Sequence, residues 1–243
     1  MKHHSLLSIL AFSTLTVVAI PTNVFAEDAV SDFEVSANVG FVSEYSFRGI
    51  KQSDEHPAIQ GGFDVGHSSG LYAGVWASNV DFDDGDKTSM EVDVYAGYAG
   101  SFKGVSYDIG AIYYAYPGAD SSDNYDFVEG AVSVGYDFDV AAVAASVNYS
   151  PEYFGDSGDA FYYALGVDVP LPADLSLSAH VGRQSIDDNT AFGVPDYTDW
   201  SLGLGYNYKG FDLSVAYIDT DLNSTECADG CDSKVIFGVS RSF

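Results

Sequence analysis

Acidic side chains are the residues of this sequence with the clearest chemical potential. They recur in segments where polar and apolar residues alternate, and they fall on the polar side of each alternation. Carboxylates on the wall of a water-filled bore concentrate cations and exclude anions. The alternative is ordinary hydrated residues, partly protonated or hydrogen-bonded, that impose no selectivity. The residues that we expect to line such a bore are Glu34, Asp64, Glu91, Asp93, Asp108, Glu129, Asp168 and Asp212.

Two basic residues, Arg48 and Lys51, lie in the polar segment 45–57 that follows the first alternating run. An arginine can hold a carboxylate through two parallel hydrogen bonds. If this segment folds back into the bore, Arg48 could pair with Glu91 or Glu129 and narrow the channel as a constriction loop does. The alternative is a solvated loop without inward contacts.

His180 is the histidine best placed for catalysis, because it falls on the polar side of its segment with Ser178 two residues away. Neighbouring positions on one side of a strand are too far apart for an evident hydrogen-bonded pair, although another strand could supply a partner. His56 lies in a loop and His67 at a turn. We therefore predict no enzyme activity, no catalytic residue and no cofactor.

Cys227 and Cys231 are the only two cysteines. Because the start of the chain indicates export to an oxidising compartment, we predict a disulfide that closes a short loop. Two thiolates alone would not satisfy zinc. A run of aspartates could gather a divalent cation, but it lacks the rest of a calcium-binding loop, and we expect a solvated charge run and no metal site. Its members are Asp81, Asp83, Asp84 and Asp86.

Alternating segments of about ten residues must position these side chains, and each has the length of a tilted strand that crosses a hydrocarbon layer. They predict an all-β protein, a single up-and-down antiparallel transmembrane barrel of about 12 strands. The segments are 33–44, 58–67, 71–80, 89–99, 104–114, 126–136, 139–149, 160–169, 174–182, 199–207, 211–219 and 234–243.

The connections between these segments alternate between short and long. Short turns rich in glycine, serine and proline alternate with long polar loops, which is typical of outer-membrane barrels with periplasmic turns and extracellular loops. The turns are 67–70, 101–104, 137–139, 170–173 and 209–210, and the loops are 45–57, 81–88, 116–124, 150–159, 184–197 and 219–233.

The apolar side of the alternation, which includes Phe63, Leu165 and Leu204, is expected to face lipid. A soluble sandwich or lipocalin would show the same alternation, with the apolar side inward. Four features favour the membrane barrel: the strand length, the turn and loop pattern, the small residues on the polar side, and Phe243 at the C-terminus. Segment 71–80 is the weakest case, since Tyr72 and Trp76 oppose its aliphatic residues.

The first 26 residues resemble a secretory signal peptide, with Lys2, an apolar stretch and a small-residue cleavage site that ends at Ala26. We predict a signal peptide over 1–26, removed on export, and the barrel over 27–243 in the bacterial outer membrane. The last strand should pair with the first, because an open edge in lipid leaves backbone groups unsatisfied. A C-terminal aromatic residue such as Phe243 resembles the recognition signal of the barrel assembly machinery.

One stretch resembles the N-terminal signature of the Gcw_chp family, also described as TorF-type porins. The matching residues are Ser43, Tyr45, Phe47, Arg48, Gly49, Gln52, Ser53, Pro57, Ala58, Gln60, Gly61, Gly62, Asp64, Gly74 and Trp76. The resemblance implies an outer-membrane pore and carries over no substrate and no catalytic residue. Lys51 departs from a more usual small polar residue of the family.

These observations predict an outer-membrane channel through which small polar solutes diffuse, with a preference for cations from its acidic lumen. A closed structural or adhesive barrel is the first alternative, and a lipid-active barrel enzyme is the weaker one. The expected partners are outer-membrane lipid and lipopolysaccharide, small polar or cationic solutes and the barrel assembly machinery. A net charge of −27 disfavours nucleic acid as a partner.

Overall fold

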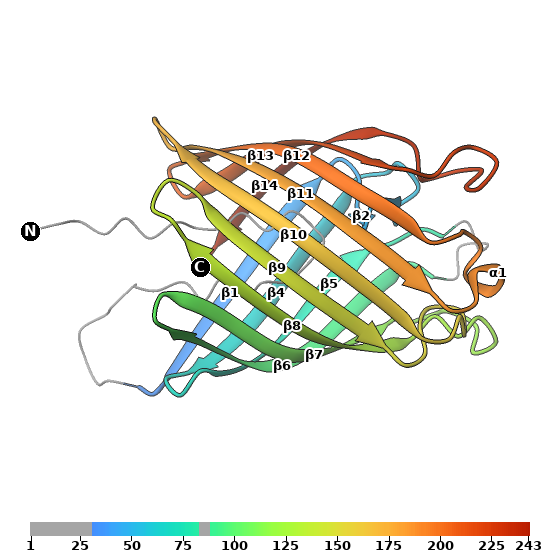
Figure 1. Cartoon of the computed structure of the whole chain (residues 1–243), viewed down its shortest axis with the longest axis horizontal. Coiled ribbons are helices and arrows are strands. Elements are labelled where there is room, and N and C mark those ends of the chain that lie inside the picture. Colours follow the sequence, from blue (N-terminus) through green and yellow to red (C-terminus); the bar gives the residue numbers. More distant parts are fainter. Residues whose placement is uncertain (1–30, 83–87) are drawn as a thin grey trace, which may run out of the picture.

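The computed structural model describes residues 31–82 and 88–243, and within them twelve antiparallel strands close into a barrel (Figure 1). The barrel class predicted from the alternation is therefore confirmed. The strands are β1 (Phe33–Val42), β4 (Ala58–His67), β5 (Leu71–Asn79), β6 (Met90–Phe102), β7 (Val105–Ala115), β8 (Phe127–Asp137), β9 (Ala142–Ser150), β10 (Ala160–Leu171), β11 (Leu175–Ile186), β12 (Tyr197–Tyr208), β13 (Phe211–Thr220) and β14 (Lys234–Ser242). The predicted signal peptide lies outside the described residues.

Three short elements lie within the loops and were not expected from the sequence. β2 (Ser46–Phe47) and β3 (Ile50–Lys51) pair with each other in the first loop. The single helical turn α1 (Asn189–Phe192) lies between β11 and β12, and Asp188 caps its start by accepting hydrogen bonds from Thr190 N and Ala191 N. No helix among the described residues is long and apolar enough to span a membrane.

The barrel closes where β14 returns to β1. Val39 lies opposite Arg241, and the Phe243 main chain both donates to Ala37 O at 2.8 Å and accepts from Ala37 N at 3.1 Å. Because every other strand pairs with its neighbours along the chain, closure leaves this sheet without an edge strand.

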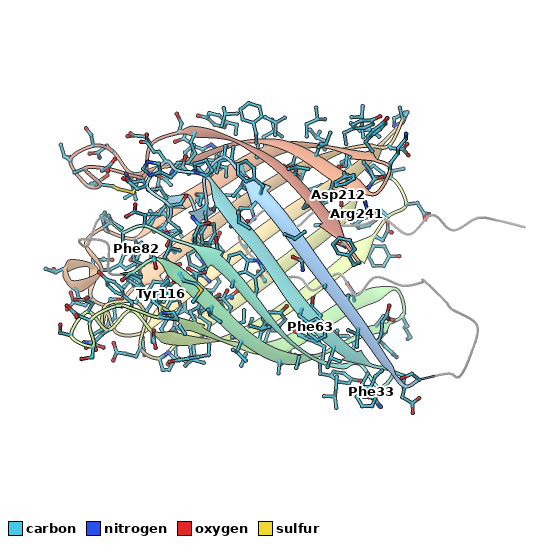
Figure 2. All side chains as sticks on the ribbon, turned by 180° about the vertical axis from the view of Figure 1, so that it is seen from behind. Phe33, Phe63, Phe82, Tyr116, Asp212 and Arg241 are labelled. Carbon is cyan, nitrogen blue, oxygen red and sulfur yellow. A yellow bond between two sulfur atoms is a disulfide. The ribbon has the colours of Figure 1, made fainter. Side chains whose placement is uncertain are left out.

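The connections have the predicted asymmetry, with short turns at one end of the barrel and long loops at the other (Figure 1). Two of the turns, Lys103–Gly104 and Lys209–Gly210, have positive φ at both residues. This is the backbone of a type I′ turn, whose twist matches that of the flanking strands. Figure 2 shows Phe82 and Tyr116 at the loop end, and Asp212 and Arg241 toward the turn end.

Apolar side chains cover the outside of the barrel, and polar ones lie inside it. Phe63, Leu165 and Leu204 are 51%, 46% and 42% exposed, whereas Asp93 and Glu129 are 8% and 1% exposed. The inverted arrangement of a soluble barrel is therefore excluded. β5, the strand that the sequence left ambiguous, follows the same rule, because its aliphatic residues Leu71 and Val75 are exposed.

Bulky side chains on the inner wall lie against glycines of neighbouring strands. Tyr95 donates a hydrogen bond to Asp64, and a Cβ added to Gly74 would lie 2.5 Å from the Tyr95 hydroxyl. Tyr162 donates to Asp199 at 2.9 Å and occupies the space that a side chain at Gly182 would need. The glycines therefore let each ring lie along the wall while its hydroxyl reaches a carboxylate.

Replacing Gly182 with alanine should destabilise the barrel by about 1–3 kcal/mol, because the new methyl group overlaps the Tyr162 hydroxyl. Gly166→Ala on β10 is the matched control, since nothing but Ala179 O at 4.0 Å approaches that position. Urea unfolding of the folded barrel in micelles measures both variants. Equal stability of the two would contradict the packing described here.

Candidate functional site

The first loop, residues 43–57, folds into the barrel and carries Arg48 at its tip. Arg48 and Gly49 join β2 to β3 with φ angles of 48° and 83°, which is the backbone of a type I′ turn. Two hydrogen bonds brace the base of this hairpin, from Gln52 N to Tyr45 O at 2.8 Å and from Tyr45 N to Ser53 Oγ at 2.9 Å. A left-handed arginine is uncommon and persists only where its surroundings hold it.

The Arg48 guanidinium pairs with groups from two well-separated strands. One nitrogen donates to Glu129 Oε2 on β8 at 2.7 Å, and another donates to Gln184 Oε1 on β11 at 2.8 Å. The sequence suggested a two-bond contact with a single carboxylate; the structure instead divides the two bonds between Glu129 and Gln184. The hairpin tip is thereby tied to two walls of the barrel.

Aromatic rings and burial complete the surroundings of Arg48. Its guanidinium carbon lies 4.2 Å from the Tyr162 ring centroid and 4.6 Å from that of Phe47, and the residue is 1% exposed. Burial alone would lower the pKa of the Arg48 guanidinium, but the adjacent Glu129 carboxylate raises that pKa well above its ordinary value. Arg48 is therefore a permanent buried cation.

Glu129 is the centre of a hydrogen-bond cluster. Besides Arg48, its Oε2 accepts from Tyr114 Oη at 3.2 Å and from Asn148 Nδ2 at 3.1 Å. A buried carboxylate needs such partners to offset its lost hydration.

Two further predicted carboxylates lie in the same loop-side part of the interior. Glu91, also 1% exposed, accepts from Tyr45 Oη at 2.8 Å, and Asp93 has one buried oxygen without a hydrogen-bond partner among the described residues. Burial and the nearby Glu91 raise the pKa of the Tyr45 phenol, which keeps it a donor. Side chains at this depth pack closely around the hairpin, as expected if the first loop folds back into the bore.

The remaining predicted carboxylates line the inner wall toward the turns. Asp108 accepts from Tyr72 Oη at 2.9 Å, and Asp212 accepts from Asn207 Nδ2 at 2.7 Å. Asp64 accepts from Tyr95, Asp168 is partly buried, and Glu34 is exposed near the turn end of β1. Glycine, alanine and serine separate most of these acids, and no lysine or arginine among the described residues lies on this part of the wall.

Lys51 and Lys234 tie the first loop to the sixth loop, residues 221–233. Lys51 Nζ lies 2.5 Å from both Asp54 and Asp229, while its backbone N–H donates to Gly230 O at 2.9 Å. Burial would lower the pKa of Lys51, yet the hydrogen bonds to Asp229 and Asp54 raise it above its ordinary value. Lys51 thus contacts loop carboxylates and not the acids of the bore.

Lys234, on the inward side of β14, also contacts the first loop. As the first residue of β14, it donates to Gly230 O at 2.8 Å and to Gly49 O at 3.3 Å, and it lies 3.5 Å from Glu44. Because Lys234 lies at the start of β14, its ammonium group contacts the hairpin and not solvent.

Cys227 and Cys231 form a disulfide within the sixth loop. The bond closes the segment that contains Asp229 and Gly230, both of which hold Lys51. Thr220 Oγ1 on β13 donates to Cys231 O at 2.9 Å and fixes the segment to the wall. The crosslinked loop therefore braces the inserted hairpin from outside.

His180 lies beside Tyr162 and Asp199. Its Nε2 is 2.9 Å from Tyr162 Oη and 3.3 Å from Asp199 Oδ1. Asp54, His56 and Asp81 also cluster, with ligand atoms within 4.8 Å of one another, but Asp54 already binds Lys51. We assign neither catalysis nor a metal to these groups; Asp83, Asp84 and Asp86 lie outside the described residues.

Sequence reasoning missed Tyr45, Tyr162 and Gln184 as parts of the site. Each is a large side chain near the loop end, and the two strand residues lie on the inward side of an alternating segment. A bulky side chain on the inward side of a strand, near the loop end, was the available signal for an interior contact.

Comparison with known proteins places most of the chain within one family. A family model described as a bacterial protein of unknown function (Gcw_chp) matches residues 26–243. No curated protein matches the sequence.

Solved outer-membrane porins share the fold at low sequence identity. The KdgM porin is 11% identical with a TM-score of 0.59, and the match covers 86% of this chain and 99% of that one. The NanC porin is 14% identical with a TM-score of 0.56, covering 86% and 99%, and an outer-membrane channel from Pseudomonas putida F1 is 11% identical with a TM-score of 0.53, covering 92% and 100%. KdgM has also been solved in complex with disordered oligogalacturonate.

Replacing Arg48 with alanine should lower the free energy of unfolding by about 3–5 kcal/mol, because it leaves Glu129 buried without its counter-charge. Adding Glu129→Gln should restore part of that loss, so the two effects will not be additive. Arg183→Ala is the control: Arg183 lies 3.7 Å from Asp221 with both side chains about half exposed, and it should cost less than about 1 kcal/mol. Urea unfolding measures all variants, and equal losses at Arg48 and Arg183 would refute the buried pair.

Proposed function

The chain belongs to the Gcw_chp family, and we propose that it is a bacterial outer-membrane channel for small polar solutes that prefers cations. The observation that carries this proposal is the charge of the inner wall. Toward the turns, Asp64, Asp108, Asp168 and Asp212 face the interior, and the described part of the chain places no lysine or arginine among them. Fixed charge of one sign inside a low-dielectric wall favours entry of the opposite sign.

The outer surface supports a position in a membrane. Exposed aliphatic residues cover the middle of the strands, and tyrosines lie closer to the strand ends, including Tyr98, Tyr107 and Tyr206 near the turns and Tyr163 and Tyr217 near the loops. Apolar bands flanked by aromatic girdles are typical of outer-membrane barrels.

Basic residues at the turn end support the orientation with turns in the periplasm. The cations of Lys103 and Lys209 lie 5.2 Å from the rings of Phe102 and Tyr208, and Arg241 lies 4.8 Å from the Phe211 ring. Long basic side chains beside outward aromatic rings suit the headgroup region of a phospholipid leaflet. The acidic loops would then face lipopolysaccharide, and Phe243 would serve as the assembly signal.

The inserted hairpin acts in this proposal as a constriction. Arg48 and its partners fill the loop-side interior, whereas the inner wall toward the turns carries mostly glycine, alanine and serine. In this proposal, solutes pass beside the hairpin or once the hairpin has moved aside. The acids on the wall between the hairpin and the turns then favour cations over anions. Oligogalacturonate is a polyanion, and a wall of carboxylates gives no reason to extend that ligand of KdgM to this chain.

A closed structural barrel is the second candidate, and the close packing around Arg48 favours it. Arg48, Glu91, Glu129 and Gln184 are each no more than 1% exposed. Conductance separates the two functions, because a structural barrel needs no open path.

After reconstitution into planar bilayers, the protein should form conducting channels. Under a salt gradient, the sign of their reversal potential should show that cations permeate better than anions. Exchanging Asp108 and Asp168 for asparagine should lower the ratio of cation to anion permeability by about twofold or more. Asp156→Asn with Asp188→Asn removes the same charge from exposed loops and should leave the ratio nearly unchanged. Absent conductance would favour the structural barrel, and anion preference would overturn the charge argument.

Leu165→Arg tests the lipid-facing surface, since this residue lies near the middle of β10 and is 46% exposed. We expect a loss of about 2–4 kcal/mol in lipid vesicles, because an arginine at the bilayer midplane is costly. Val140→Arg at a turn, where Val140 is 74% exposed, should cost about 1 kcal/mol or less. Urea titration, monitored by tryptophan fluorescence, gives both values. Equal losses for the two variants would argue against a bilayer midplane at the level of Leu165.

A further inference from the structure

A pocket of about 390 Å³ lies at the loop end of the barrel, directly above the inserted hairpin. All six long loops or the adjoining strand ends contribute to it, so it occupies the entrance to the interior. Residues that represent the six are Phe47, Phe82, Tyr125, Phe154, Phe192 and Asp229. Its volume suits a small organic molecule.

Aromatic rings form most of the wall and are held by one another. Tyr125 and Phe154 stack with their centroids 4.4 Å apart, and Phe82 meets them edge-on at 5.5 and 5.7 Å. Phe192 lies 5.5 Å from Tyr153, the residue before Phe154. Phe82, Tyr125, Phe154 and Phe192 all remain partly exposed, so the assembled wall is accessible from the pocket.

The charged groups of the pocket are mainly acidic. Among the described residues, Asp54, Asp81 and Asp229 line it together with one cation, Lys51. Lys51 Nζ is already held between Asp54 and Asp229 at 2.5 Å from each, so it is poorly placed to pair with an anionic ligand. The lining thus combines ring faces with an excess of negative charge.

We propose that this pocket binds a small organic cation that carries a ring or a quaternary ammonium group. Aromatic faces attract such cations through their quadrupoles, and desolvated contacts of this kind are the stronger ones. The neighbouring carboxylates add Coulomb attraction and would repel an acidic solute. The biological role of this pocket rests on the proposed channel function, because the pocket would capture a solute at the mouth of the cation-preferring bore.

Isothermal titration calorimetry of the folded protein in non-ionic micelles tests the proposal with three probes of similar size. Benzyltrimethylammonium should bind, benzyl alcohol should bind about tenfold more weakly or not at all, and benzenesulfonate should not bind. Phe154→Ala and Phe192→Ala should each weaken the cation about fivefold or more. Phe138→Ala is the matched control, because its exposed ring lies at a turn at the other end of the barrel.

Asp81→Asn separates charge from ring contact, and it should weaken the cation while leaving benzyl alcohol unchanged. Heat-modifiable migration on gels confirms that each variant remains folded. Equal binding of the three probes, no binding of the cation, or unchanged affinity in both phenylalanine variants would overturn the proposal. The binding experiment uses no membrane, so its result is independent of conductance. Binding of the cation by a protein that does not conduct would contradict the channel proposal alone. Conductance by a protein that does not bind the cation would contradict the pocket proposal alone.

Discussion

The interior of this barrel depends on one buried cation, Arg48. Taking a guanidinium out of water costs several kcal/mol, and only a matched carboxylate with further hydrogen bonds offsets that penalty. Glu129 and Gln184 supply those partners from two strands, while Tyr162 and Phe47 cover the cation. The pair therefore decides where the hairpin lies and how the loop-side interior is filled.

The backbone at the hairpin tip is adapted to this position. Gly49 has a φ of 83°, and a Cβ there would lie 2.5 Å from Thr220 Cγ2 and 3.0 Å from Asp199 Cβ. Glycine is thus required both by the turn and by the close approach to the wall. The sixth loop supports the same arrangement from outside, where Gly230 accepts hydrogen bonds from Lys51 and Lys234. The hairpin is therefore held both by the buried contacts of Arg48 at its tip and by the contacts of Lys51 and Lys234 with the sixth loop.

The sequence predicted the barrel well because the strand period and the inside–outside rule act on every residue. All twelve predicted segments match observed strands to within a few residues at their ends. Segment 71–80 was ambiguous, because its rings and its aliphatic residues fall on opposite sides of the strand. Tyr72 and Trp76 point inward to meet Asp108 and Tyr45. Short elements such as β2 and β3 have no period to detect.

The contacts of the site were harder to foresee from the sequence. Arg48 and its two candidate carboxylates could be named, but the choice of Glu129 depends on how a closed barrel brings β8 and β11 around the first loop. Gln184 and Tyr162 lie far from Arg48 along the chain, so local pattern gives no pairing. Lys234 was missed for the same reason, since its partners come from two loops that only the fold brings together.

The most direct test of this account is nuclear magnetic resonance of the arginine side chains in micelles. The Arg48 guanidinium protons should exchange with water at least about tenfold more slowly than those of the half-exposed Arg183, and Glu129→Gln should remove much of that protection. Exchange at Arg48 as fast as at Arg183 would show that the hairpin tip is solvated and would contradict the buried ion pair on which the description of the interior rests.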